Sequence, residues 1–353
     1  MTTRCPGPMP PGPMPPGSTL PGSTPRALGR RAALAAALAV SPLLMMNRPA
    51  RAASAVRVGV LRFGTVAWEL DVVRAHGLDR AAGVAVEPVE FAASQATQVA
   101  LQAGHVDAAT QDWLWVARQR ASGADYACAP SSAAVGAVVA PQASPVRGLA
   151  DLDGRRLGIA GSPLDKSWLI LRAHARKSLG LDLDARVQKT FGPPPLLAEQ
   201  LAAGRLDAAL TYWPFVARAE AGGMRRVMGV EEAVRGLGIA GAVPFVGYAF
   251  SEGWAARNRA ALDGFLKASR RARAILAERD EEWQRIAPLT GAAGTAELHR
   301  LRDAYRAGVL PRWGEAERAA TARLYDVLAE IGGPALVGPA TRLPPGTFWE
   351  TSA

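Results

Sequence analysis

Two stretches of the chain place polar and aromatic side chains at the same spacing. Residues 101–123 and 201–223 lie one hundred residues apart, and 12 of their 23 aligned positions are identical. Asp112 and Trp113 occupy the same places in the first copy as Tyr212 and Trp213 in the second. Hydrogen-bonding groups beside an aromatic ring are typical of a small-molecule binding site.

Both copies predict a helix, a short strand and a second helix. Gly104 and Gly204 end the first helices, where a left-handed cap suits glycine. The strands follow at about 105–110 and 205–211, and the second helices begin near the two tryptophans. Ligands of α/β sheets bind outside the carboxyl ends of the strands. The repeat therefore predicts a ligand held between two similar lobes.

Other predicted strand ends add candidates. Thr65 and Ser162 each place a hydroxyl after a glycine that follows the strands 56–61 and 157–160. Ser94 follows the strand 84–91 and is suited to capping a helix. Asp165 follows the strand 157–160 and lies in the first turn of the next helix, where a negative charge interacts favourably with the helix dipole. We expect Asp107 and Asp207 to serve turns rather than a ligand. The candidate ligand-binding residues are Gly64, Thr65, Trp68, Ser94, Asp112, Trp113, Ser162, Asp165, Tyr212 and Trp213.

The order of elements predicts an α/β chain with two mostly parallel sheets flanked by helices. We expect one lobe over 56–140 and 245–353, which includes a strand at 133–140, a returning strand at 243–250 and C-terminal helices at about 254–279, 281–287, 295–307 and 315–331. The second lobe covers 146–240, with a helix opened by Ser162 and Pro163. Crossings near 141–147 and 238–246 make a hinge.

Residues 1–52 read as a proline- and glycine-rich segment followed by a signal peptide. Arg30 and Arg31 precede an apolar run over 32–46 and an A-x-A site at 50–52, which predicts cleavage near Ala53 and a periplasmic protein. The paired arginines leave both the general secretory and the twin-arginine routes open. The alternative interpretation is a buried or membrane-anchoring helix.

The net charge of +10 does not indicate a nucleic-acid partner. Residues 1–52 contain six arginines and no acid, which leaves 35 basic and 31 acidic residues in the remainder, without a basic block. Cys128 alone follows the predicted cleavage site, and the four histidines lack metal-ligand spacing. The sequence therefore predicts no enzyme, no metal and no cofactor.

Three motifs resemble one family of proteins. They are Asp151-Leu-x-Gly-Arg-Arg with Gly161-Ser162, Gly204-x-x-Asp207 with Tyr212-x-Pro-Phe, and the pattern from Phe91 to Asp107. Over about 56–330 the chain resembles the solute-binding proteins of ABC importers of the nitrate, sulfonate and taurine type, which include thiamine-pyrimidine binders. The resemblance implies a two-lobed type II periplasmic-binding-protein fold. It also implies a monomer that captures a small organic solute or oxyanion and delivers it to a membrane permease and its ATPase.

Two departures from the family bear on the solute. Ser94 replaces a usual glycine and Asp112 a usual small residue. An aspartate at the cleft opposes an anion, so we expect a neutral or cationic flat solute stacked on tryptophan. The alternatives are a periplasmic sensor or accessory protein with the same fold, and an enzyme resembling the pyrimidine synthases.

Overall fold

The computed structural model describes residues 54–62, 64–310 and 312–350. The predicted proline-rich segment, signal peptide and cleavage site lie outside these residues. Among the described helices, none combines the length and the apolar character that crossing a membrane requires.

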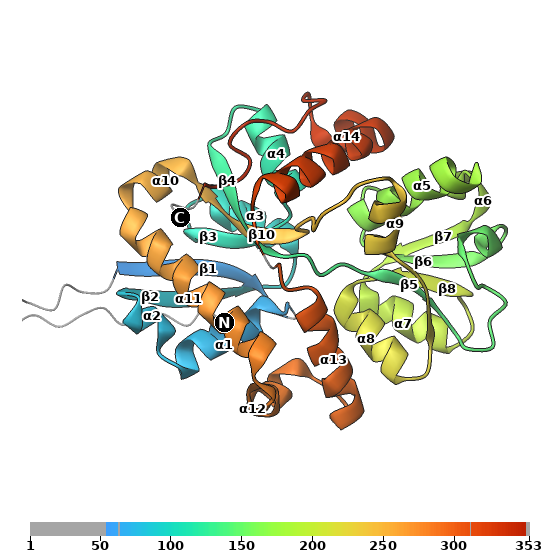
Figure 1. Cartoon of the computed structure of the whole chain (residues 1–353), viewed down its shortest axis with the longest axis horizontal. Helices are drawn as coiled ribbons and strands as arrows, with labels where there is room; N and C mark the ends of the chain where they lie inside the picture. The colour runs from blue at the N-terminus through green and yellow to red at the C-terminus, as the bar shows by residue number, and fades with distance from the viewer. Residues whose placement is uncertain (1–53, 63, 311, 351–353) are drawn as a thin grey trace, which may run out of the picture. The chain divides into compact units, whose positions relative to one another are not determined.

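The first sheet has the strand order β2-β1-β3-β10-β4 (Figure 1). Its strands are β1 (Ser54–Leu61), β2 (Val84–Phe91), β3 (Ala108–Gln111), β4 (Tyr126–Ser132) and β10 (Val246–Ser251). β2, β1 and β3 pair in parallel, and β10 runs antiparallel between β3 and β4. Four of the five strands therefore run in one direction, as predicted.

Helices cover both faces of this sheet. α1 and α11 pack on one face, and α3 and α4 pack on the other (Figure 1). We call the first sheet and its helices the first lobe. The helices are α1 (Val66–Ala75), α2 (Leu78–Ala81), α3 (Ser94–Gln102), α4 (Trp113–Ala121), α10 (Glu252–Arg257), α11 (Arg259–Glu278), α12 (Asp280–Thr290) and α13 (Thr295–Ala307).

The second sheet repeats this plan in the order β7-β6-β8-β5-β9. Its strands are β5 (Ala137–Ala140), β6 (Arg156–Ala160), β7 (Gln188–Gly192), β8 (Ala208–Thr211) and β9 (Arg225–Gly229). β5 is the antiparallel strand, paired with β8 and β9. With its helices this sheet forms the second lobe. The helices of the second lobe are the 3-10 helix Leu149–Leu152, α5 (Lys166–Leu179), α6 (Leu183–Arg186), α7 (Pro194–Ala202), α8 (Trp213–Ala221) and α9 (Val230–Gly236).

The predicted strand over 133–140 is corrected by the structure. Residues 133–136 form the first crossing segment between the lobes, and β5 lies in the second sheet. The second crossing segment, residues 237–245, returns the chain to β10 as predicted. All four residues of β5 are buried. An apolar run of this kind is compatible with either sheet, so only the tertiary pairing decides its place.

The C-terminal helices contact both lobes, although the sequence assigned them to the first. α13 packs against α8, where Arg218 pairs with Glu297 at 2.9 Å. α14 (Glu315–Val337) packs against α4 and α5, and its helical geometry is interrupted at Gly333. The predicted helix at 254–279 is two helices, α10 and α11, which meet at Asn258.

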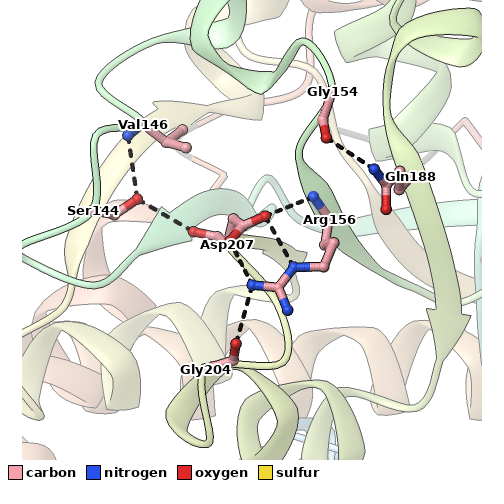
Figure 2. A network of polar contacts seen from close by, with 7 residues as sticks. All are labelled: Ser144, Val146, Gly154, Arg156, Gln188, Gly204 and Asp207. Carbon is pink, nitrogen blue, oxygen red and sulfur yellow. Dashed lines mark hydrogen bonds and ion pairs between the residues drawn. The ribbon is translucent and has the colours of Figure 1, made fainter.

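An arginine–aspartate pair connects the first and third strands of each lobe. In the second lobe Asp207 accepts hydrogen bonds from the backbone N–H of Arg156 (2.8 Å) and from its guanidinium (2.7 and 3.2 Å) (Figure 2). The same guanidinium donates to the carbonyl of Gly204 at 3.1 Å. Arg57 and Asp107 repeat these contacts in the first lobe. These aspartates are therefore structural, as the sequence predicts.

A buried polar cluster fixes α1 in the first lobe. Glu69 on α1 is 3% exposed and accepts hydrogen bonds from Tyr305 at 3.0 Å and Tyr248 at 3.3 Å. Arg273 on α11 lies 3.4 Å from the same carboxylate. Burial raises the pKa of Glu69, and these donors oppose the shift. The cluster holds the beginning of α1, and with it Trp68, against α11, α13 and β10.

We expect Asp207→Asn and Asp107→Asn each to lower the free energy of unfolding by about 1–2 kcal/mol, because hydrogen bonds to a charged group stabilise by roughly 1.5–3 kcal/mol and asparagine keeps part of them. Chemical denaturation followed by circular dichroism measures the change. Asp153→Asn is the matched control, because Asp153 and Arg186 are 49% and 59% exposed. It should change stability by less than ~0.5 kcal/mol. Equal losses in Asp153→Asn and Asp207→Asn would contradict a structural role.

The stability of Asp207→Asn relative to wild type should also depend on pH. The hydrogen bond from Arg156 holds the pKa of Asp207 below its ordinary value. The folded state therefore gains stability from Asp207 above the unfolded pKa of about 4 and loses it as pH falls through the folded-state pKa. The difference between wild type and Asp207→Asn should shrink below about pH 4.

Candidate functional site

The carboxyl ends of the parallel strands lead directly into helices from both lobes. α1, α3 and α4 follow β1, β2 and β3, and α5 and α8 follow β6 and β8. The first turn of a helix has free backbone N–H groups and a partial positive charge. Thr65, Ala93 and Tyr212 precede α1, α3 and α8 and make no capping hydrogen bond with their side chains. The beginnings of α1 and α3 can donate backbone hydrogen bonds to a solute, whereas Pro214 leaves the beginning of α8 with fewer donors.

Aspartates cap the other two helices. Asp112 accepts from the backbone N–H of Leu114 at 2.9 Å and caps α4. Asp165 accepts from the backbone N–H of Ser167 at 2.9 Å and caps α5. The predicted cap of α5 by Ser162 is therefore wrong, since the helix begins four residues later. The Ser162 hydroxyl instead accepts from the backbone N–H of Leu164 in the preceding turn.

Asp112 also forms an ion pair that joins the two lobes. Lys166, the first residue of α5, donates to the Asp112 carboxylate, and the two side chains are 15% and 30% exposed. Burial opposes the charge on Lys166, but the carboxylates of Asp112 and Asp165 outweigh it and raise the pKa of Lys166. This ammonium is therefore charged, and we call the contact the interlobe ion pair.

The interlobe ion pair corrects the expected effect of Asp112. That expectation assumed an unpaired carboxylate, whereas Lys166 neutralises it. Lys166 is not among the candidates from the sequence, although it directly follows the candidate Asp165. A usable signal was present: the chain has four lysines among 41 basic residues, and this one follows a strand end.

Tyr212 and Asp165 extend the interlobe ion pair within the second lobe. The Tyr212 phenol hydrogen-bonds to Asp165, and burial is the main cause that raises the pKa of each. A Cβ on Gly161, whose φ is +96°, would lie 2.9 Å from the Tyr212 hydroxyl. The absence of a side chain there lets the phenol reach Asp165. Tyr212 is still 40% exposed, so one part of its side chain is accessible.

Four aromatic rings form a second contact between the lobes. Trp213 on α8 packs edge-on against Trp68 of α1, with 6.0 Å between ring centroids. Tyr305 and Trp283 complete this interlobe aromatic cluster. Trp68 is 5% exposed and donates its indole N–H to the carbonyl of Leu289. Trp68 is therefore a core residue, whereas Trp213 is half-buried and lines the cavity described below, so its ring can border a solute.

The remaining candidates lie in different surroundings. Trp113 is fully buried, donates its indole N–H to the carbonyl of Pro244 at 2.7 Å and packs against Tyr325. A side chain so placed belongs to the core. Ser94 is exposed and is the first helical residue of α3, not its cap as predicted. Gly64 and Thr65 are half-buried in the turn that precedes α1.

A cavity of about 760 Å³ opens beside the crossing segments, within the range usual for small-molecule sites. Trp213 connects it with the interlobe aromatic cluster. Phe245 connects it with the interlobe ion pair, because its ring lies 5.9 Å from the Lys166 ammonium. The lining residues are Ala133, Ala134, Val135, Trp213, Arg226, Glu231, Val234, Arg235, residues 238–243, Phe245, Ala304, Ala307 and Gly308.

The described residues contain no group of three or more histidine, cysteine, aspartate or glutamate side chains that could hold a metal ion. Cys128 is 1% exposed, and burial raises the pKa of its thiol well above the ordinary value. A buried, protonated thiol is a poor nucleophile. Cys128 is therefore a core residue, as the sequence predicts.

Two sheets of identical strand order, joined by two crossing segments and bordered by helix N-termini, define a two-lobed α/β binding-protein fold. The sequence comparison agrees, because the NMT1/THI5-like family model matches residues 72–282. The chain belongs to this family. No curated protein sequence matches it.

Solved structures share the fold at low sequence identity. The periplasmic aliphatic sulphonate-binding protein SsuA of Escherichia coli is 20% identical, with a TM-score of 0.67 over 85% of this chain and 93% of that chain. The alkanesulfonate-binding SsuA of Xanthomonas axonopodis pv. citri, bound to MOPS, is 20% identical, with a TM-score of 0.64 over 84% and 98%. A putative sulfonate-binding protein of Methylobacillus flagellatus KT is 16% identical, with a TM-score of 0.62 over 84% and 91%.

The first crossing segment passes so close to β8 that a side chain at Gly136 would not fit, which a substitution can test. A Cβ on Gly136 would lie 1.8 Å from the carbonyl oxygen of Thr211, whereas one on Gly148 would meet no atom within 4 Å. We expect Gly136→Ala to lower the free energy of unfolding by about 1–3 kcal/mol, because the backbone must shift. Gly148→Ala, the control, should change it by less than ~0.5 kcal/mol. Thermal unfolding of both variants measures the difference, and equal behaviour would show that the crossing segment tolerates displacement.

Proposed function

We propose that this protein is the solute-binding component of an ABC importer. The observation that carries the proposal is the duplicated α/β lobe, whose two copies present helix N-termini and aromatic rings to one another. A small organic solute or oxyanion would bind between the lobes, and rotation about the two crossing segments would close them. The closed protein would deliver the solute to a membrane permease driven by an ATPase.

The residues proposed to contact the solute fall into three groups. The interlobe ion pair, with Tyr212 and Asp165, supplies polar groups. Trp213 supplies a stacking surface that Trp68 supports from the core, and the helix ends at Thr65 and Ser94 supply backbone donors. Gly64 and Ser162 lie in the turns that place these groups. Trp113 supports the site from the core.

Several properties of the proposed component follow from the same reasoning. Two of the structural relatives described above bind sulfonates, which makes sulfonates a solute class to test alongside nitrate and pyrimidines. The protein would act in the periplasm as a monomer and without a cofactor. Catalysis is not part of the proposal, because Cys128 is buried and protonated and the structural relatives described above are binding proteins.

Native mass spectrometry of the purified protein should show a co-purified small molecule, and calorimetry with sulfonates, nitrate and pyrimidines should identify a micromolar binder. Tyr212→Ala should weaken that binding at least tenfold, because it removes both the phenol bonded to Asp165 and its accessible face. Asp207→Asn is the control: it lies at the opposite end of β8 and should lower stability while leaving Kd unchanged. No binder and no co-purified molecule would contradict the proposal.

A separate prediction concerns export of the protein and removal of its signal peptide. Expression of the full chain in a Gram-negative host should give a periplasmic product whose N-terminus lies close to Ala53. N-terminal sequencing of that product measures the cleavage site. A mature protein that retains Met46 would show that residues 32–46 are not removed.

A further inference from the structure

The interlobe ion pair carries an inference about the solute, and this inference rests on the proposed function. One charge comes from each lobe: the carboxylate of Asp112 from the beginning of α4, and the ammonium of Lys166 from the beginning of α5. Both side chains are partly buried where the lobes meet, with 15% of Lys166 and 30% of Asp112 exposed. Any solute that enters between these helix ends must either leave the pair intact or separate it.

Asp165 is the neighbouring group that comes nearest to a replacement partner, because its carboxylate also raises the pKa of Lys166. Asp165 already accepts hydrogen bonds from the backbone N–H groups of Ser167 and Trp168 and from the Tyr212 phenol. Phe245 contributes only a ring face to the ammonium. Cys128, on the side of Asp112, has a protonated thiol. Separation of the pair would therefore expose one charge to a solute and leave the opposite charge without an equivalent partner.

Such a separation is unfavourable, because removal of one partner from a buried ion pair leaves an uncompensated charge. A solute with a single negative charge could take Lys166 only by releasing Asp112. A solute with a single positive charge could take Asp112 only by releasing Lys166. An uncharged solute avoids both costs and can still contact the accessible part of Tyr212 and stack on Trp213.

We propose that the interlobe ion pair makes the site select uncharged solutes against solutes that carry a single charge, with Asp112 and Lys166 as its specificity-determining residues. Removal of either charge converts the site into a charge-selective one. Without the Asp112 charge, Lys166 keeps the weaker attraction of Asp165 and can bind an anion. Without the Lys166 charge, Asp112 is free to bind a cation.

The chain allows this to be tested with near-isosteric changes. Asparagine caps helices as well as aspartate, so Asp112→Asn keeps the cap of α4 and removes only the charge. Lys166→Met keeps a long apolar stem and a high helix propensity. The double variant Asp112→Asn/Lys166→Met restores charge balance without the ion pair. Thermal unfolding confirms that each variant is folded before binding is measured.

Calorimetry with three probes of similar size separates the outcomes: benzenesulfonamide is uncharged, benzenesulfonate is an anion and benzylammonium is a cation. Wild type should bind the sulfonamide at least tenfold more tightly than either charged probe. Asp112→Asn should gain at least tenfold for benzenesulfonate, and Lys166→Met should gain at least tenfold for benzylammonium. The double variant should again prefer the sulfonamide. Asp153→Asn, whose exposed pair lies elsewhere, should behave as wild type.

Tighter binding of a charged probe by wild type would overturn the proposal, and so would single variants whose preferences match those of wild type. Failure of all three probes to bind wild type or any of the variants would overturn it as well. The proposed solute-binding function is judged separately, by the co-purified molecule in native mass spectrometry and by the wider calorimetric panel. The charge selection can therefore fail while solute binding stands.

Discussion

The duplicated arginine–aspartate pair is the constraint on which both lobes depend. In each lobe one carboxylate, Asp107 or Asp207, accepts hydrogen bonds from both the backbone N–H and the guanidinium of an arginine. That arginine lies within β1 (Arg57) or begins β6 (Arg156). The carboxylate belongs to the turn that leads into the third strand. The pair therefore holds the middle of β1 beside the amino end of β3, and the amino ends of β6 and β8 side by side. With one end fixed, the carboxyl ends and their helix N-termini must also be neighbours.

The exchange of one strand between the lobes has a different consequence. β5 and β10 each complete the sheet of the opposite half of the chain, and the crossing segments that carry them pass close to the strand ends. Gly136 permits that passage, because a side chain would meet the carbonyl of Thr211. The site and the connections between the lobes are therefore built from adjoining residues. A solute beside Phe245 or Trp213 would act directly on the segments that let the lobes move.

The charges of the site can be understood only as a set. Two aspartates neutralise two helix N-termini, and one of them also holds a lysine from the other lobe. Each aspartate considered alone suggests repulsion of anions, and Lys166 alone suggests their attraction. Their combination in a partly buried site makes either charge costly to separate from its partner. This is why a single residue does not predict the charge of the solute.

The sequence by itself determined the repeated helix–strand–helix unit and the α/β class, because local periodicity and the repeat can be observed directly in the sequence. It also determined the left-handed glycines at 104 and 204, which follow from backbone sterics, and the structural role of Asp107 and Asp207. It also placed Asp112 and Tyr212 at strand ends and Asp165 in the first turn of a helix. Only the tertiary structure decided that β5 belongs to the second sheet, that α14 contacts both lobes, that Trp113 is core and that Lys166 pairs with Asp112. Each of these depends on which distant segments meet, and a buried apolar run or a charged side chain has the same local pattern whichever partner the fold brings to it.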